Sequence, residues 1–133
     1  EISECLVGSE MCIRDRIQYI NAHATSTPVG DLNEAKAIAE VFGNHRPYVT
    51  STKSQTGHEM WMAGASEVIY SILMMNNGFI APNLNFEEPD EASALLNIPS
   101  RRIETEFDTF LSNSFGFGGT NSSLIIRKFK ENN

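Results

Sequence analysis

Two histidines and a lysine lie where a side chain could act on a carbonyl group. His58 follows Lys53 by five residues in TSTKSQTGHEMW (50–61), and His23 lies in NAHATST (21–27), a stretch rich in small hydroxylated residues. A neutral imidazole keeps one N–H to donate, so it can polarise a carbonyl oxygen without itself carrying charge. Spacing alone leaves the ordinary alternative open for each histidine, which is an exposed side chain or one bonded to a neighbouring carbonyl.

Metal and phosphate chemistry find weaker support in the sequence. The segment HEMWM differs from the zinc motif H-E-x-x-H by Met62 at the second ligand position, so we expect no metal site. FGFGGTN (115–121) is glycine-rich, but no G-K-[ST] follows, and by itself it predicts a tight turn. Its glycines, Gly116 among them, could also let backbone N–H groups approach a substrate oxygen. Phe115 and Phe117 could form a movable apolar gate.

A first helix is predicted over residues 31–42 from its capping residues and its apolar spacing. Asp31 has the type of an N-cap, Glu34 three residues later completes a variant of the capping box, and Gly43 stands at the C′ position. The apolar residues recur at i, i+3, i+4 and i+7, and they are Ala35, Ile38, Ala39 and Phe42. This stripe is expected to face the core.

A second helix is predicted to begin at Thr56 and to end at Gly78. Thr56 and Glu59 fit the capping box T-x-x-E, which places His58 in the first turn. The positive end of the helix dipole disfavours an imidazolium there, and Lys53 acts in the same direction, so we expect a neutral His58. The stripe expected to be buried is Ala65, Val68, Ile69, Ile72 and Leu73.

The remaining elements are short strands separated by loops. Strands are predicted over residues 16–20, 48–52, 108–114 and 122–129, and residues 79–100 form a long loop with three prolines. Strands that alternate with helices are typical of an α/β fold, in which functional loops follow the carboxyl ends of strands. His23 and the segment from Lys53 to His58 both fall in such loops.

The composition is that of a folded domain with an acidic charge balance. The 133 residues are 41% hydrophobic and 20% charged, and the net charge of −7 argues against binding to nucleic acid. No apolar run reaches the roughly 20 residues that span a membrane, so we expect no membrane segment. Cys5 and Cys12 have neither a metal-site spacing nor the number for a disulfide framework, and a reducing cytoplasmic setting is expected.

From about Ile17 to Phe129 the chain resembles the C-terminal part of the β-ketoacyl-[acyl-carrier-protein] synthases, elongating condensing enzymes of the thiolase-like superfamily. The resemblance rests on four blocks in order: NAHATSTPVGD, STKSQTGH, GFIAPNLN and SNSFGFGGTN. It covers most of this chain but only about the last third of a family member. It implies the C-terminal half of a thiolase-like α/β/α layered fold, with a mixed sheet and two main helices, that is incomplete as an isolated chain.

The resemblance also implies a reaction. In the family a cysteine is acylated, two histidines assist the decarboxylation of a malonyl thioester, and the resulting carbanion attacks the acyl-enzyme in fatty acid elongation. The match puts His23 and His58 on those histidines and Lys53 on the active-site lysine. The implied partners are an acyl carrier protein, whose phosphopantetheine carries the substrates, and a second subunit of the full-length parent. No cofactor or metal is implied.

Further residues match family positions that bind the substrate or support the site. Thr25 and Thr27 match threonines that hydrogen-bond the phosphopantetheine arm. Phe117 matches a phenylalanine whose backbone N–H helps to form the oxyanion hole and whose ring gates the acyl pocket. Glu34 matches a buried acidic residue near the lysine, for which a structural role is expected.

The chain departs from the family in three places. The segment from Glu59 to Met62 replaces the commoner small residues after the histidine, and Trp61 within it could alter the pocket wall or the dimer contact. Neither Cys5 nor Cys12 lies in the family's nucleophile context, so the chain alone is expected to be inactive in condensation. Residues 1–15 do not resemble the family, and we interpret them as a non-native or disordered leader before a domain at 16–133.

Two other interpretations remain open. A non-catalytic ketosynthase-like subunit, of the chain-length-factor type, would shape the pocket of a partner, although it would have little reason to keep both histidines and the lysine. A small metal-binding or redox domain is the other, and it predicts stoichiometric metal in the purified protein.

Overall fold

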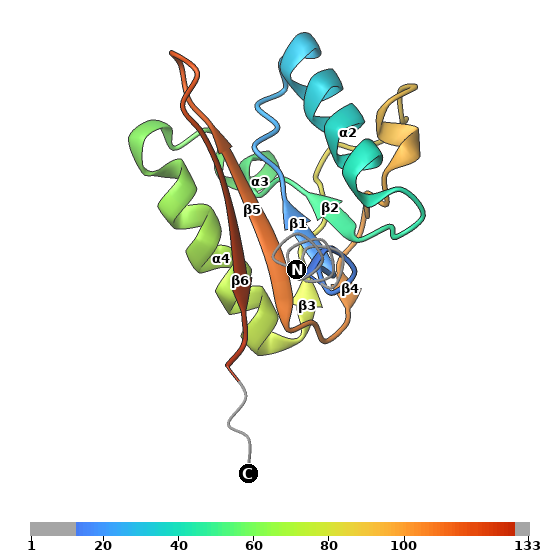
Figure 1. Cartoon of the computed structure of the whole chain (residues 1–133), viewed down its shortest axis with the longest axis vertical. Coiled ribbons are helices and arrows are strands. Elements are labelled where there is room, and N and C mark those ends of the chain that lie inside the picture. The colour runs from blue at the N-terminus through green and yellow to red at the C-terminus, as the bar shows by residue number, and fades with distance from the viewer. Residues whose placement is uncertain (1–12, 130–133) are drawn as a thin grey trace, which may run out of the picture.

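The computed structural model of the chain describes residues 13–129, in which strands and helices alternate (Figure 1). The strands are β1 (Tyr19–Asn21), β2 (Tyr48–Thr50), β3 (Phe79–Ile80), β4 (Ile103–Glu104), β5 (Thr109–Phe115) and β6 (Asn121–Arg127). The helices are α2 (Pro28–Phe42), α3 (Lys53–Thr56) and α4 (Ala63–Asn77), with the short 3-10 helices η1 (Met60–Met62) and η2 (Ser93–Leu95).

Four strands form one mixed sheet in the order β2-β1-β5-β6. β1 pairs in parallel with both of its neighbours, so that Ile20 lies opposite Val49 on one side and Leu111 on the other. β6 returns antiparallel to β5, and β3 and β4 form a separate antiparallel pair. Because β1 is central, the loop after its carboxyl end lies beside the ends of two parallel neighbours, which is where α/β folds place functional residues.

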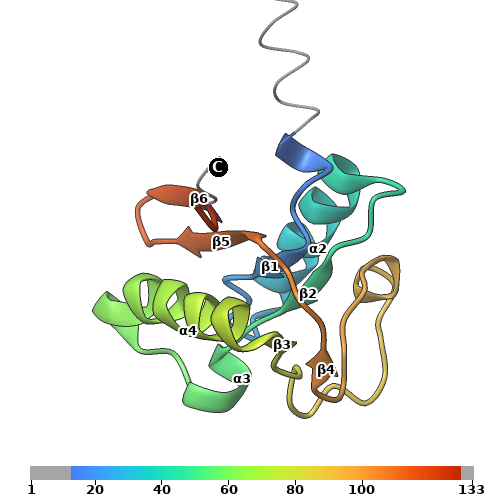
Figure 2. The ribbon, with the colours of Figure 1, turned by 90° about the horizontal axis from the view of Figure 1, so that it is seen from below.

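The two faces of the sheet are covered by different helices, α2 on one side and α4 on the other (Figure 2). Because successive residues of a strand point to opposite faces, β1 contributes Ile20 to one core and Tyr19 to the other. The core under α2 consists of Ile17, Ile20, Ala22, Ile38, Phe42, Val49 and Leu111. The core under α4 consists of Tyr19, Met74, Met75, Ile80, Phe107 and Phe110. The predicted α/β architecture with a mixed sheet and two main helices is confirmed.

Helix α2 begins three residues earlier than predicted and ends where predicted. Pro28 takes the first helical position, where its fixed φ suits the helix and no N–H is required, and Thr27 is the N-cap without a side-chain capping bond. Asp31 lies in the first turn, so its prediction as the N-cap was wrong. Gly43 ends the helix with a φ of 52°, which favours glycine. The buried face consists of Glu34, Ala35, Ile38 and Phe42.

Helix α4 begins at Ala63, well after the N-cap predicted at Thr56. Thr56 is instead the last residue of α3, and Gly57 follows it with a φ of 78°. Met60 has a φ of 51°, so the backbone between the two helices cannot continue as an α-helix. The predicted capping box was therefore wrong, and His58 lies in an irregular loop rather than in the first turn of a helix.

The buried face of α4 differs from the predicted apolar stripe and combines Ser66, Glu67 and Ser71 with apolar residues. Its buried residues are Ala63, Ser66, Glu67, Ser71, Met74 and Met75. Ile69 and Leu73, which the stripe predicted to be buried, are 56% and 52% exposed. A Cβ atom on Gly64 would lie only 2.8 Å from the hydroxyl oxygen of Ser114 on β5. The helix thus approaches the sheet closely through small and polar residues and carries apolar side chains on its outer face.

The other predicted elements are present with shifted ends. β1 begins at Tyr19 rather than at residue 16, and β5 and β6 lie within two residues of their predicted bounds. Residues 79–100 are mostly irregular, as predicted, apart from β3 and η2.

Two expectations fall largely or wholly on residues that the structure does not describe. Cys5 and Cys12 lie outside the described residues, as do residues 1–12 of the proposed leader at 1–15. Within 13–129, none of the helices combines the length and the hydropathy that a membrane crossing requires.

The packing of α4 gives a direct test of which face is buried. We expect Ile69→Ser to change the free energy of unfolding by no more than about 0.5 kcal/mol, because its side chain is already exposed. Met74→Ala should cost about 2–5 kcal/mol, because it leaves a cavity in the core under α4. Urea unfolding of both variants measures the difference, and equal losses would contradict the observed orientation of the helix.

Candidate active site

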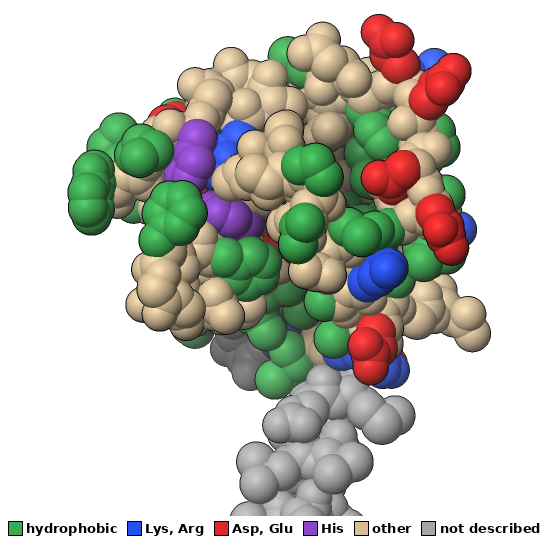
Figure 3. Space-filling view, turned by 90° about the horizontal axis from the view of Figure 1, so that it is seen from above, with side chains coloured by type: hydrophobic (Ala, Val, Ile, Leu, Met, Phe, Trp, Pro, Cys, Tyr) green, Lys and Arg blue, Asp and Glu red, His purple; other side chains and the backbone are tan. Residues whose placement is uncertain are grey.

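The loops after β1 and β2 bring the two predicted histidines and the lysine to one end of the sheet. The ring centroids of His23 and His58 lie 5.6 Å apart, and the rings meet edge to face at 88°. Figure 3 shows this end of the molecule, where two histidine side chains lie side by side next to a basic side chain. Lys53 is the first residue of α3, just beyond β2. The structure thus brings together residues from two segments that are about 30 positions apart in the sequence, His23 after β1 and Lys53 with His58 after β2.

Glu34 holds the main chain of the loop that carries His23. The N–H groups of His23 and Ala24 donate to its two carboxylate oxygens at 3.0 and 2.8 Å. The side-chain amide of Asn113 on β5 donates to the same carboxylate at 3.1 Å. Ala24 and Ser26 have φ values of 23° and 62°, which side-chain-bearing residues rarely adopt, so the loop needs such support. Glu34 therefore supports the His23 loop instead of completing a capping box.

Lys53 is buried and paired with Glu67 of α4. Only 6% and 3% of the two side chains are exposed, and Lys53 Nζ donates to Glu67 Oε1. Burial raises the pKa of Glu67, and the hydrogen bond from Lys53 acts against that rise. The amide of Asn21, at the end of β1, donates to the Glu67 carbonyl oxygen at 3.3 Å and to Ser71 Oγ at 3.1 Å. These contacts tie β1, α3 and α4 together.

Sequence reasoning missed three buried polar residues of this region. Asn21, Glu67 and Asn113 are 0%, 2% and 6% exposed. Two signals were present, because Asn21 directly precedes the candidate loop and Glu67 interrupts a mainly apolar helical stretch. Neither signal indicates which residue would be the partner, because the partners lie on other elements. The apolar stripe predicted for α4 lies on its exposed side, and it therefore predicted an exposed Glu67.

The backbone N–H of Met60, two residues after His58, determines which nitrogen of the neutral His58 ring carries hydrogen. The Met60 N–H donates to His58 Nδ1 at 3.2 Å. A neutral imidazole whose Nδ1 accepts a hydrogen bond carries its hydrogen on Nε2, so Nε2–H is the donor that this exposed ring can offer. The helix-dipole basis for a neutral His58 fails, because α4 begins only at Ala63. The backbone hydrogen bond decides instead which nitrogen of a neutral His58 ring carries the hydrogen.

His23 is half-buried in a setting that disfavours its protonation. Burial lowers the pKa of His23 most, and the positive charge of Lys53 and the neighbouring His58 lower it further, while Asp31 acts in the opposite direction. Nδ1 of His23 is buried and has no hydrogen-bond partner among the described residues. Two neutral imidazoles side by side can offer N–H donors to one oxygen that gains negative charge.

The glycine-rich loop forms the tip of the β5–β6 hairpin, and Phe115 rather than Phe117 contacts His23. The Phe115 ring lies 5.6 Å from the His23 ring at 67°, whereas Phe117 is fully exposed. The Gly116 N–H donates to the Thr120 carbonyl oxygen at 2.8 Å, which closes the turn. A Cβ atom on Gly116 would lie 3.3 Å from that oxygen. Substrate contacts of these three loop residues stay predictions.

Thr25 and Thr27 lie in the turn between β1 and α2. Their Oγ1 atoms are 3.3 Å apart, with Thr25 half-buried and Thr27 exposed. Gly30 makes room for this pair, because a Cβ atom there would collide with Thr27 Oγ1. Both hydroxyl groups stand on the loop that carries His23, and their binding to a substrate arm stays a prediction.

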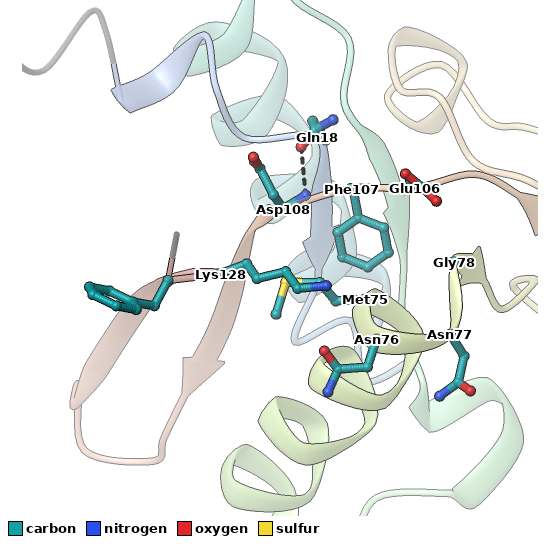
Figure 4. A pocket seen from close by; sticks show the side chains of 10 residues that line it. Gln18, Met75, Asn76, Asn77, Gly78, Glu106, Phe107, Asp108 and Lys128 are labelled. Carbon is teal, nitrogen blue, oxygen red and sulfur yellow. Dashed lines mark hydrogen bonds between the residues drawn. The ribbon is translucent and has the colours of Figure 1, made fainter. Parts of the chain in front are cut away.

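Within residues 13–129, the histidine pair coincides neither with a metal cluster nor with the cavity of about 610 Å³. Within residues 13–129, no three His, Cys, Asp or Glu side chains converge closely enough to hold a metal ion. A cavity of about 610 Å³ lies where β5 begins and β6 ends, and Gln18, Met75, Glu106 and Lys128 are among its lining residues (Figure 4). The histidines do not line this cavity.

Comparison with known proteins finds sequence relatives over most of the chain. Residues 3–87 match the family described as "Beta-ketoacyl synthase, C-terminal domain". The match begins within residues 1–15, which were expected not to resemble the family. The 3-oxoacyl-[acyl-carrier-protein] synthase 1 of Escherichia coli (strain K12) is 54% identical over 115 residues, which cover 86% of this chain and 28% of the relative. The chain therefore spans less than a third of the length of this curated relative.

Solved structures share the fold. The ishigamide ketosynthase/chain length factor aligns with a TM-score of 0.83 at 34% identity, covering 88% of this chain and 29% of that chain. A type II PKS acyl-carrier protein in complex with its ketosynthase, bound to the hexaketide, aligns with a TM-score of 0.82 at 32% identity. It covers 88% of this chain and 29% of that one.

The setting of His23 predicts a pH dependence of stability. The folded chain binds a proton on His23 less tightly than the unfolded chain does. The free energy of unfolding should therefore fall as the pH drops below about 6.5, and His23 should not reduce it above that pH. The free energy of unfolding, measured with urea, should therefore fall more between pH 7.5 and pH 5.5 for the native chain than for His23→Gln. An NMR titration that places His23 above its ordinary pKa would contradict the assignment.

The Lys53–Glu67 pair predicts strongly coupled mutations. Lys53→Met or Glu67→Leu alone should cost about 3–5 kcal/mol in unfolding free energy, because each leaves one buried charge without its partner. The double variant should recover most of that loss. Glu104→Gln is the matched control, because it breaks an exposed pair with Arg102 and should cost less than about 1 kcal/mol. Additive losses in the double variant would show that the two side chains act independently.

Proposed function

Because this chain belongs to the β-ketoacyl synthase family and matches its C-terminal domain, we propose that it supplies the decarboxylation residues of a β-ketoacyl-ACP synthase. The observation that carries the proposal is the edge-to-face contact of His23 and His58, with ring centroids 5.6 Å apart. The substrate is malonyl-ACP, and the reaction is a decarboxylative Claisen condensation with an acyl-enzyme thioester in fatty acid elongation.

The histidines act as neutral hydrogen-bond donors in this proposal. The bond between the malonyl methylene carbon and the carboxylate breaks, CO2 leaves, and the electron pair forms an enolate on the thioester. N–H donors from His58 and His23 stabilise the enolate oxygen, and the low pKa of His23 keeps that ring neutral. The enolate carbon then attacks the acyl thioester and expels the cysteine thiolate. Lys53 holds the arrangement together and disfavours protonation of His23.

The remaining site residues bind the thioester arm and the acyl group. Thr25 and Thr27 offer hydroxyl groups to the phosphopantetheine. The backbone around Phe117 contributes an oxyanion donor, and the Phe115 and Phe117 rings border the acyl group. Gly116 keeps the turn tight enough for this approach. The carrier is an acyl carrier protein, which the solved complex of a ketosynthase with its acyl-carrier protein supports as a partner.

The acyl-carrying nucleophile is not among residues 13–129, because the two cysteines of the chain stand at positions 5 and 12. We infer that condensation requires a ketosynthase nucleophile from outside the described residues, in a full-length homodimeric enzyme of the cytoplasm. No resident cofactor takes part. The alternative of a chain-length-factor type subunit, suggested by the ishigamide relative, is disfavoured by the presence of both histidines and the lysine.

A chimera tests the assigned roles. This chain replaces the 115-residue segment that it matches in the Escherichia coli synthase at 54% identity, and CO2 release from malonyl-ACP is measured. His23→Ala and His58→Ala should each slow decarboxylation by about 10²–10³-fold, because each removes a donor to the enolate oxygen. His45→Ala is the matched control, since the His45 ring bonds the Ile17 carbonyl oxygen away from the site. Near-normal decarboxylation in both site variants would refute the proposal and favour the non-catalytic alternative.

A further inference from the structure

Glu59 joins the loop that carries His58 to helix α4. The Tyr70 hydroxyl group donates to Glu59 Oε1 at 3.0 Å. Side chains of a helix lean toward its N-terminus, so Tyr70, two turns into α4, reaches back to the loop that precedes the helix. Ser66 lies one turn nearer on the same face, and the hydroxyl groups of Ser66 and Tyr70 lower the pKa of Glu59. The carboxylate is therefore an ionised anchor for the loop.

The backbone beside this anchor is bent in an unfavourable way. Met60 has a φ of 51°, in the left-handed region that a residue with a Cβ atom rarely adopts. The Met62 N–H donates to the Glu59 carbonyl oxygen at 3.2 Å, which closes the bend. The same bend aims the Met60 N–H at His58 Nδ1. The bond between Glu59 and Tyr70 lies directly beside this strained residue and ties the bend to α4.

We propose that Glu59 and Tyr70 are positioning residues that set the tautomer of His58. Their hydrogen bond holds the backbone from His58 to Met60 in the bend, the bend presents the Met60 N–H to Nδ1, and the ring hydrogen is thereby left on Nε2. The use of that hydrogen as a donor rests on the proposed function. The tautomer itself is observable without substrate, so it can be confirmed or refuted whether or not decarboxylation is found.

A competing explanation is that Glu59 acts through its charge. Lys53 lowers the pKa of Glu59, so the carboxylate interacts through space with the charges of the site. Two substitutions separate the alternatives. Glu59→Gln keeps an oxygen that can accept from Tyr70 but removes the charge, whereas Tyr70→Phe keeps the charge but removes the donor.

The experiment uses NMR of the full chain, labelled with ¹⁵N, at a pH where the imidazoles are neutral. The two ring nitrogens of His58 report the tautomer through their chemical shifts, and hydrogen exchange of the Met60 amide reports the bond to Nδ1. We expect Tyr70→Phe and Glu59→Ala to speed that exchange about two- to tenfold, as loss of one supported hydrogen bond implies. The His58 nitrogen shifts should move toward those of a free imidazole. Glu59→Gln should resemble the native chain.

Controls separate this local effect from general loss of stability. Tyr48→Phe removes a tyrosine hydroxyl group on β2 and should leave both His58 signals unchanged. Exchange of the Ile20 amide in the core reports global opening, and it should stay constant in Tyr70→Phe. If Glu59→Ala unfolds the chain, Tyr70→Phe decides, because it removes a single oxygen atom. Unchanged His58 shifts and Met60 exchange in Tyr70→Phe would overturn the proposal, as would a Glu59→Gln variant that behaves like Glu59→Ala.

Discussion

The buried ion pair of Lys53 and Glu67 is the constraint on which the active end of the sheet depends. Two charged side chains that are buried away from water must pair with each other and accept or donate further hydrogen bonds, because an unpaired buried charge is strongly destabilising. This requirement fixes α3 against α4, and Asn21 then ties the end of β1 to the same helix through the Glu67 carbonyl oxygen. The rotation of α4 follows, with Ser66, Glu67 and Ser71 turned inward beside the core methionines and Ile69 and Leu73 turned outward.

The same arrangement sets the electrostatics of the two histidines. A lysine held beside the site makes a second positive charge unfavourable, and burial of His23 acts in the same direction. In His58, a backbone N–H bonded to Nδ1 leaves the hydrogen of a neutral ring on Nε2. Neutral donors need no prior proton transfer, and donors that are already in place require little reorganisation when an oxygen becomes negatively charged. The positive charge of Lys53 thus lowers the pKa of His23 through space.

The loops that carry these side chains are irregular, and the carboxylates of Glu34 and Glu59 support their shapes. Glu34 accepts the N–H groups of His23 and Ala24, which the turn leaves without partners in the sheet. Glu59 accepts the Tyr70 hydroxyl group and holds the second loop to α4. Acidic residues near a histidine site can therefore be structural. An overall negative charge does not by itself indicate how the site is charged.

The sequence by itself determined the alternation of strands and helices, the glycine ends of both main helices, and the placement of His23 and of the segment from Lys53 to His58 after the first two strands. These follow from local rules, because turn residues and apolar spacing act within a few positions of the chain. Only the tertiary structure decided which face of α4 is buried, where that helix begins, and which atom of His58 carries hydrogen. These features depend on partners from other elements, such as Glu67 for Lys53. The helical period predicts which residues of a helix share a face, but it does not predict which face packs against the sheet.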